Sequence, residues 1–320
     1  MKTYIHKQFN SILKTYHVNS MLIAVSGGQD SLCLIKLTED FIRLHKITAD
    51  IEYIYIDHQW RQDSIYQAQH LVSHISQRKC NLSIYQIKNL TFSELDARHL
   101  RYQIIIGHAK KHRLSTVITA HTVTDAVETF IQKIIRGSSL DSATGLNMQR
   151  KISGKIQVIR PLIKFSRAEL NWFCRKFFLP TWSDTTNYYH NINRNRLRHE
   201  LIPYIKKYYS CSIENNLSKL INNYIIDNDY IKQNTIKLYL LNRHKFSIAI
   251  NHKIIQKQHL ALKIRILQMF FYHNFNKCLS NNKLYKLINI INKVGIESNL
   301  YTLKWKSMAV KISNKWIYVI

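Results

Sequence analysis

Short apolar runs alternate with longer amphipathic stretches from residue 21 to residue 136, and this alternation constrains the fold more than any other feature. Four runs rich in Ile, Val and Tyr predict buried strands at 21–26, 51–57, 82–87 and 116–121. Helical patterns occur at about 30–45, 63–78, 93–113 and 123–136. Because strands separated by helices pair in parallel through right-handed crossovers, the sequence predicts an α/β fold with an open, mainly parallel twisted sheet and helices on both faces.

Three of the predicted strands end in residues suited to chemistry. The first is followed by Ser26-Gly27-Gly28, the second ends at Asp57-His58, and the fourth ends at His121. Ligands of open parallel sheets bind beyond the carboxyl ends of the strands. We therefore expect a functional site at this edge of the sheet.

The remainder of the chain suggests a second, smaller part. An apolar run covers 156–162, and Ser166 with Glu169 forms a capping-box pattern that opens a helix to about residue 178. Beyond about 210 the chain has a helical pattern, and its last twenty residues alternate like a short hairpin. We expect a catalytic domain over residues 1–208, followed by a smaller, mainly helical and basic C-terminal part over residues 209–320.

Charge is the strongest feature of the composition. Lys and Arg number 47 against 19 Asp and Glu, a formal net charge of +28, and residues 201–320 alone hold 19 basic and 4 acidic side chains. Such an excess attracts polyanions and suits binding to a nucleic-acid backbone. The alternative is a compositional bias, because Lys, Ile, Asn and Tyr are frequent throughout, as in proteins from AT-rich genomes.

Several classes of protein are disfavoured. No run approaches the roughly 18–20 apolar residues of a membrane helix, and the first residues lack the apolar core of a secretory signal. The five cysteines, at 33, 80, 174, 211 and 278, contain no CxxC pair, which disfavours a disulfide framework or a cysteine-bound metal site. We expect no membrane association, a reducing compartment and no obligatory protein partner.

The turn Ser26-Gly27-Gly28-Gln29-Asp30-Ser31 stands between the first predicted strand and the first predicted helix. Only seven glycines occur in the chain, and two of them are adjacent here. Glycine permits a positive φ and a close approach of a ligand to the backbone, and consecutive N–H groups at a helix start attract anions. The serine hydroxyls can donate to phosphate, and Asp30 can hold Mg²⁺ against it. An ordinary tight turn is the alternative for the glycine pair taken alone.

Two carboxylates, Asp125 and Glu128, follow His121 closely at the start of the fourth predicted helix. Their spacing of three residues places them on one helix face, where they can bind an ammonium group or a metal ion. The alternative is a helix start capped by Thr122 or Thr124, in which the acids only complement the helix dipole.

The order of motifs resembles that of the tRNA(Ile)-lysidine synthases over residues 20–205. The SGGxDS turn is followed, in the family's order and close to its spacing, by Asp-His-x-x-Arg (57–61), Glu-x-x-x-Arg-x-x-Arg-Tyr (94–102), a block from Thr119 to Ser138, Gly-Leu (145–146), Arg-Pro-Leu-Ile (160–163), a block from Trp182 to Asn187, and Arg-Asn-x-x-Arg (194–198). The chain departs from the family at Thr122 and Thr124, where a second His and the first of two Asp residues are usual, and at Trp60, which replaces an aliphatic residue.

The resemblance implies a PP-loop domain that splits ATP into AMP and pyrophosphate. In this family ATP adenylates the C2 oxygen of the wobble cytidine in the CAU anticodon of tRNA(Ile), and free lysine then attacks C2 and expels AMP. The product, lysidine, changes the codon from AUG to AUA and the amino-acid identity from Met to Ile. ATP, Mg²⁺, lysine and this tRNA are therefore the expected substrates, cofactor and partners.

The resemblance also implies roles for individual residues. Residues 26–31 would hold the pyrophosphate, with Mg²⁺ on Asp30. Asp125 and Glu128 would orient the lysine ammonium, and one of the two would accept its proton. Arg101, or alternatively Arg98, would neutralise charge at the transferred phosphate, and His121 would contact the nucleotide or be structural. RNA phosphates would bind Arg194, Arg196 and Arg198, unless these form only a solvated helix face.

Alternative functions are another PP-loop tRNA-modifying enzyme such as a tRNA thiolase, a small-substrate synthetase, and a non-catalytic RNA-binding relative. Thiolases usually need a persulfide cysteine or a cysteine-held cluster, which the scattered cysteines disfavour. The AT-biased composition and the shortened C-terminal part resemble plastid-encoded members of the family, so we expect a plastid stroma, with a bacterial cytoplasm as the alternative.

Overall fold

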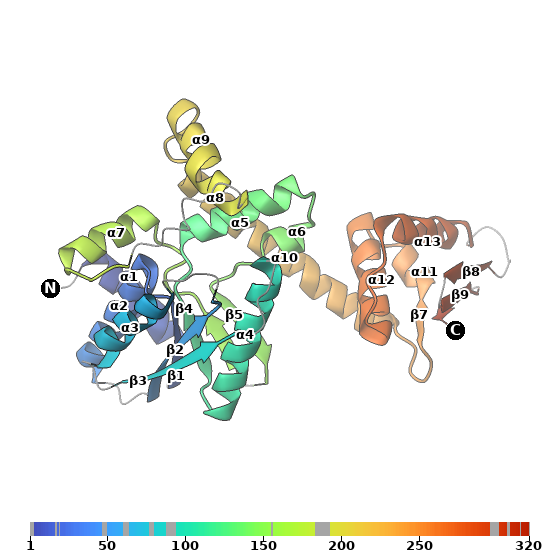
Figure 1. The fold of residues 1–320 in the computed structure, drawn as a ribbon. Helices are drawn as coiled ribbons and strands as arrows, with labels where there is room; N and C mark the ends of the chain where they lie inside the picture. The colour runs from blue at the N-terminus through green and yellow to red at the C-terminus, as the bar shows by residue number, and fades with distance from the viewer. Residues whose placement is uncertain are drawn as a thin grey trace. The chain divides into compact units, whose positions relative to one another are not determined.

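The computed structural model describes the whole chain except residues 1–2, 17, 19, 47–49, 60–63, 77–79, 88–93, 155, 183–192, 295–300, 306–307, 314 and 320. The chain divides into two compact units, Met1–Asn222 and Asn223–Ile320. The division falls within the long helix α10 (Ile213–Asn242), past the boundary that the sequence suggested at residues 208 and 209 (Figure 1).

The first unit alternates strands and helices as predicted. Its helices are α1 (Tyr4–Thr15), α2 (Gln29–His45), α3 (Ser64–Ser76), α4 (Glu94–Lys111), α5 (Val123–Ile135), α6 (Leu140–Ala143), α7 (Arg167–Lys176), α8 (Asn193–Arg196), the π-helix Leu197–Leu201 and α9 (Ile202–Tyr208). Its strands are β1 (Ser20–Val25), β2 (Asp50–Asp57), β3 (Asn81–Gln86), β4 (Thr116–Thr119), β5 (Gln149–Ser153) and β6 (Ile156–Ile159).

The strands form one six-stranded sheet in the order β3-β2-β1-β4-β6-β5. Five of them run parallel, and β5 alone is antiparallel, paired to β6. The predicted open, mainly parallel α/β sheet is therefore confirmed. Because β1 lies between β2 and β4, the turn after β1 stands at the same sheet edge as the residues that follow β2 and β4.

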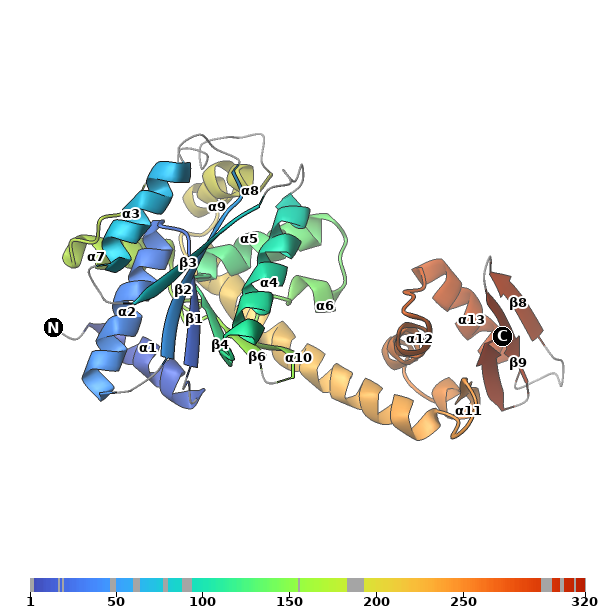
Figure 2. The ribbon, with the colours of Figure 1, turned by 60° about the horizontal axis from the view of Figure 1, so that its bottom comes forward.

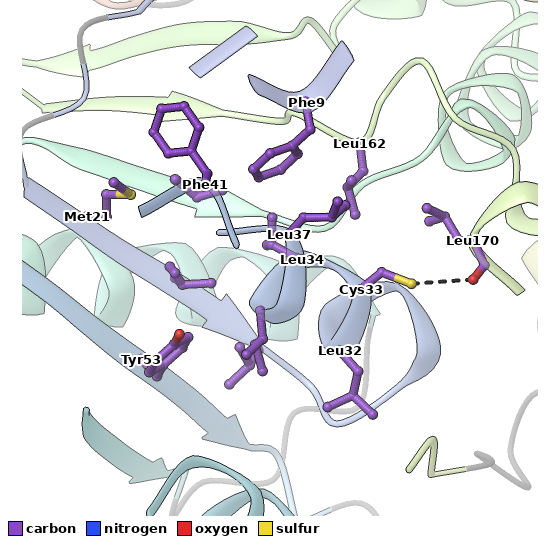
Figure 3. Packing of buried hydrophobic residues seen from close by; sticks show 14 of the residues in the cluster. Phe9, Met21, Leu32, Cys33, Leu34, Leu37, Phe41, Tyr53, Leu162 and Leu170 are labelled. Atoms are coloured by element: carbon purple, nitrogen blue, oxygen red, sulfur yellow. Dashed lines mark hydrogen bonds between the residues drawn. The ribbon is translucent and has the colours of Figure 1, made fainter. Parts of the chain in front are cut away.

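Alternating side chains of the strands face two different cores. On one face, Met21 and Ile23 of β1 pack with Phe9 of α1 and with Leu34 and Leu37 of α2 (Figure 3). On the other face, Leu22 of β1 and Ile54 of β2 pack with Ile105 and Ala109 of α4. The helices on the two sides of the sheet are visible in Figure 2. The sheet is therefore covered by a buried apolar layer on each face.

The second unit contains helices and an antiparallel sheet. After α10 come β7 (Ala249–Asn251), α11 (His252–Gln256), α12 (Leu260–Phe275), α13 (Asn281–Val294), β8 (Tyr301–Trp305), β9 (Met308–Ile312) and β10 (Trp316–Val319). The strand order is β7-β10-β9-β8. Its core joins Phe270 and Phe271 of α12, Leu287 of α13, and Ile312 and Ile317 of the sheet. The C-terminal part is mainly helical, as predicted. Its last twenty residues form three strands instead of the two of a hairpin, and β7, which is distant in sequence, adds a fourth.

Two local features are not evident in the sequence pattern. Strand β5 is largely polar and carries no apolar run. The π-helix Leu197–Leu201 precedes Pro203, which stands at the beginning of α9. Among the described residues, none of the helices combines the length and apolar character needed to cross a membrane.

Candidate active site

The turn between β1 and α2 has the geometry of an anion site. Gly28 is the N-cap of α2 and offers the helix no side-chain cap, whereas Thr122 and Ser166 cap α5 and α7 with full capping boxes. The first N–H groups of a helix have no intrahelical partner and carry partial positive charge. At the start of α2 the backbone N–H donors therefore remain available to an anion. At the starts of α5 and α7 the capping side chains bond such donors instead.

The two glycines of this turn do different things. Gly27 has φ +75°, and a Cβ there would lie 3.4 Å from Cγ of both Gln67 and Leu71. Gly28 has an ordinary φ of −73°, and a Cβ there would meet only the Ser26 Oγ, at 3.6 Å. The left-handed backbone expected for the glycine pair is thus needed at Gly27 alone, and the absence of a side chain at Gly28 leaves space on the open side of the turn.

The hydroxyl groups of the turn also differ. Ser26 is exposed, whereas Ser31 is buried and its Oγ donates to the Gly28 carbonyl at 2.8 Å. Gln67 of α3 donates to the Ser26 carbonyl at 2.5 Å, which fixes the turn from behind. Of the two serines predicted to contact phosphate, Ser26 therefore faces solvent and Ser31 stabilises the turn itself.

Helix α7 holds the turn from the other side. Gln29 donates to the Arg167 carbonyl at 3.0 Å, and the thiols of Cys33 and Cys174 meet with their Sγ atoms 3.2 Å apart. Cys33 also donates to the Leu170 carbonyl at 3.4 Å (Figure 3). These contacts place the first residue of α7, Arg167, beside the turn.

Asp30 and Asp125 face the same guanidinium nitrogen. Nη2 of Arg167 lies 3.5 Å from Asp30 Oδ2 and 3.6 Å from Asp125 Oδ1. Burial raises the pKa of Asp30 to about 6, even though the charge of Arg167 opposes the shift. For Asp125, burial also pushes the pKa upward, but the charges of Arg194 and Arg167 outweigh it and the pKa is lowered. The turn and the carboxylate pair thus belong to one electrostatic cluster.

The carboxylate pair is occupied by arginines. Glu128 is fully buried, and it accepts from Arg194 Nε at 2.7 Å and from Arg198 Nε and Nη2 at 2.6 and 2.9 Å. Asp125 Oδ1 accepts from Arg194 at 2.7 Å, while its Oδ2 accepts from the Thr122 backbone and hydroxyl, both at 2.9 Å. The capping role and the cation-binding role of Asp125 are therefore both present, one on each oxygen.

The predicted basic stripe does not form one exposed face. Arg194 and Arg198 point at Glu128, whereas Arg196 is 61% exposed and lies 3.3 Å from Glu200. Arg194 lies in α8 and Arg198 in the π-helix that follows it, and both side chains reach Glu128 of α5. Arginines four residues apart, which looked like a phosphate-binding face, are instead drawn to a buried carboxylate.

His58 and His121 follow the ends of β2 and β4, and Arg101 lies on α4. Arg101 donates to His58 Nε2 at 2.9 and 3.1 Å, and burial together with this cation lowers the pKa of His58 to about 4. His121 shares a hydrogen bond with Thr119 at 2.9 Å, and burial and Arg160 lower its pKa to about 3. Both imidazoles are therefore neutral at pH 7, and neither is suited to accept a proton there.

A cavity of about 200 Å³ borders the cluster. It is lined by Thr124, Arg167, Ala168, Arg198, Ile202, Pro203, Lys206 and Glu214. Thr124 donates to Glu214 at 3.2 Å and Lys206 to the same carboxylate at 2.6 Å. The cavity thus presents cations and one carboxylate to a small charged molecule.

Sequence reasoning missed Arg167 and Arg160. Arg167 had a signal, because a cation at the first position of a helix opposes the helix dipole and so calls for a local acidic partner. Arg160 is 2% exposed and donates to the Asn147 carbonyl at 2.7 Å and to the Tyr102 hydroxyl at 3.3 Å. Its guanidinium lies close enough to lower the pKa of His121.

Comparisons with known proteins identify the family of the chain. The family model described as the PP-loop domain matches residues 1–205. A chloroplastic tRNA(Ile)-lysidine synthase of Gracilaria tenuistipitata var. liui is 48% identical, over 99% of this chain and 99% of that relative. Its counterpart in Pyropia yezoensis is 34% identical, over 99% of this chain and 96% of that relative.

A solved structure shares the fold at much lower identity. The U34-tRNA thiolase NcsA from Methanococcus maripaludis, with its [4Fe-4S] cluster, superposes with a TM-score of 0.57 and 14% identity, covering 68% of this chain and 78% of that chain. At this identity the likeness concerns the fold alone. The full-length relatives and the matching PP-loop domain show that the chain belongs to the tRNA(Ile)-lysidine synthase family.

Proposed function

We propose that this protein ligates lysine to C2 of the wobble cytidine in the CAU anticodon of tRNA(Ile), using ATP. The C2 oxygen attacks the α-phosphate of ATP and pyrophosphate leaves; the side-chain amine of lysine then attacks C2, and AMP leaves with the oxygen. The observation that carries this proposal is the shared guanidinium of Arg167, 3.5 Å from Asp30 of the turn and 3.6 Å from Asp125. The proposed phosphate site and the proposed amine site are therefore adjacent, as the second step requires.

The turn at residues 26–31 receives the phosphates that leave as pyrophosphate. The uncapped start of α2 and the exposed Ser26 supply donors, and the space beside Gly28 admits the ligand. Arg167 lies beside this turn and compensates negative charge that builds up there. Arg101, held by the neutral His58, is the further candidate for a contact with the transferred phosphate.

Mg²⁺ fits the residues present. The oxygens of Asp30 and Asp125 already converge on a cation, the guanidinium of Arg167, and Mg²⁺ is commonly held by one or two carboxylates together with substrate phosphates. Asp30, with Asp125 beside it, would hold the ion. When bound, Mg²⁺ neutralises phosphate charge, and it keeps Asp30 ionised despite the raised pKa of that carboxyl.

Asp125 and Glu128 form the proposed site for the lysine ammonium. Both carboxylates form ion pairs with the guanidinium groups of Arg194 or Arg198, which supports their ability to bind a cation. Because these guanidinium groups already bond Glu128 through both of its oxygens, lysine must displace one of them or share Asp125 with Arg167. The lowered pKa of Asp125 keeps this carboxylate charged and able to bind the ammonium.

RNA phosphates are the proposed ligands of the outward-facing cations. Arg196 is exposed, whereas Arg194 and Arg198 bind the buried Glu128. The C-terminal unit, residues 223–320, carries 16 Lys and Arg against 3 Asp and Glu, which suits nonspecific contact with the tRNA backbone. The chloroplastic relatives support a plastid as the place of action.

The decisive experiment is mass analysis of tRNA(Ile) after incubation with ATP, Mg²⁺ and lysine. We expect a mass increase that maps to the wobble cytidine and requires both ATP and lysine. Glu128→Gln should abolish or strongly reduce it, whereas Glu200→Gln, an exposed acid in the same arginine-rich segment, should not. An unmodified wobble cytidine in the presence of a folded protein and all substrates would contradict the proposal.

A further inference from the structure

Three ligand-type side chains converge at the sheet edge opposite the candidate active site. They are Glu52 near the start of β2, His108 in the last turn of α4, and His112 just beyond α4. Within the part of the chain that the structure describes, they form the one group of His, Cys, Asp and Glu whose ligand atoms lie close together, all within 4.8 Å of one another.

The carboxylate of Glu52 joins both imidazoles. Its Oε2 lies 2.7 Å from His108 Nε2, and its Oε1 lies 3.3 Å from His112 Nδ1. The two rings are stacked, with centroids 4.1 Å apart and planes inclined by 12°. Metal–ligand bonds of about 2.0–2.1 Å in a tetrahedron place ligand atoms roughly 3.3 Å apart. The observed separations are thus close to those of a metal site, and side-chain adjustment alone can centre an ion.

His108 is also oriented from behind. Its side chain is almost fully buried, and its Nδ1 lies 2.9 Å from the Tyr85 hydroxyl of β3. A metal-bound histidine commonly donates its other ring N–H to an oxygen, which fixes the tautomer and presents the remaining lone pair to the ion. Tyr85 can accept such a bond, so the outer partner that a metal-bound His108 needs is already in place.

We propose that Glu52, His108 and His112 bind a zinc ion, with a water molecule as the fourth ligand. Imidazole and carboxylate together suit Zn²⁺, whereas Mg²⁺ and Ca²⁺ prefer oxygen ligands alone. The ion replaces the proton that otherwise lies between His108 and Glu52. It ties the end of α4 to β2, two elements that in its absence meet here through hydrogen bonds.

The site is separate from the phosphate-binding turn. Glu52 lies five residues before Asp57, at the carboxyl end of β2, which is roughly 16 Å along a strand at about 3.3 Å per residue. Neither histidine belongs to the cluster around Arg167 and Glu128. Zinc binding is therefore expected to stabilise the fold, and it does not depend on the proposed reaction.

The test is zinc titration of the purified full-length chain, stripped of metal beforehand, by isothermal titration calorimetry. His112→Gln and Glu52→Gln remove one ligand each, and His99→Gln is the matched control, because His99 is exposed on the same helix outside the cluster. We expect one Zn²⁺ per wild-type chain with micromolar or tighter affinity. The affinity should fall more than about 100-fold in the two ligand variants and remain unchanged in the control.

Tyr85→Phe provides a finer test. Removal of this single hydroxyl should weaken zinc binding by about 10- to 100-fold, the usual effect of losing an outer partner, and zinc should raise the melting temperature of the wild type more than that of His112→Gln. Circular dichroism of the metal-free variants establishes that they are folded. Absence of stoichiometric zinc in the wild type, or equal affinity in wild type, His112→Gln and Glu52→Gln, would overturn the proposal.

Discussion

Glu128→Gln tests the carboxylate pair most directly. The side chain is fully buried and accepts three hydrogen bonds from Arg194 and Arg198. The amide keeps the shape but removes the charge, and its NH₂ group faces guanidinium donors instead of accepting from them. Removing one partner of a buried ion pair typically destabilises a protein by about 3–5 kcal/mol. We expect a loss of this size in the free energy of unfolding, measured with denaturant.

The same variant should impair the use of lysine. Loss of a hydrogen bond between charged groups weakens binding by about 1.5–3 kcal/mol, which corresponds to roughly a 10- to 150-fold higher lysine KM. This is measured as tRNA-dependent AMP release against lysine concentration, at a temperature where circular dichroism shows the variant folded. ATP-dependent release of pyrophosphate should change much less, because the phosphates bind at the turn.

Glu200→Gln is the matched control, since Glu200 pairs with Arg196 on the surface. Exposed pairs contribute only about 0.2–1 kcal/mol, so neither stability nor lysine KM should change appreciably. Equal stability of Glu128→Gln and Glu200→Gln would refute the buried charge network. Lower stability with an unchanged lysine KM would leave the network in place and refute the amine site.

Three further predictions concern the turn, its acid and the C-terminal unit. Because the folded pKa of Asp30 is raised to about 6, above an unfolded value of about 3.9, the free energy of unfolding should decrease as the pH rises from about 4 to about 6 and then level off. Asp30→Asn should remove this pH-dependent loss of stability, about 3 kcal/mol, and should also abolish Mg²⁺-dependent pyrophosphate release. If the stability of the wild type and of Asp30→Asn depended on pH in the same way, the raised pKa of Asp30 would be refuted. Gly28→Ala should fold normally yet impair ATP use, whereas Gly27→Ala should lower stability by about 1–2 kcal/mol for the left-handed backbone; normal ATP use by Gly28→Ala would remove the turn from the phosphate site. Deleting residues 223–320 should flatten the salt dependence of tRNA binding in a filter assay, and an unchanged slope would mean that the charge there is compositional bias.

The parallel sheet could be predicted because its signal is local. Strands such as β4 and β6 are short, apolar and followed by helices with clear caps, Thr122 and Ser166. Strand β5 could not be predicted, because Gln149–Ser153 is largely polar and becomes a strand only through its antiparallel pairing with β6. The short β7 is likewise defined by β10, more than sixty residues later in the chain.

The turn at residues 26–31 was predictable for the same reason, whereas its neighbours in space were not. Gly27, Gly28 and Asp30 are consecutive in sequence and in space. Arg167 reaches Asp30 only because α7 packs on α2. No periodicity within either segment reports that contact.

The pairing of Arg194 and Arg198 with Glu128 follows from the small number of acidic residues in the chain. With 19 acidic residues in a chain of net charge +28, cations greatly outnumber partners, so each basic segment taken alone looks free to bind RNA. A buried carboxylate reverses this expectation, because an unpaired charge in the interior is far more unfavourable than an unpaired charge in water. The buried Glu128 therefore needs cationic partners close to it in the fold, and Arg194 and Arg198 are these partners. In a strongly basic chain, the few acids on apolar helix faces are thus the best guide to which cations are not available to a nucleic acid.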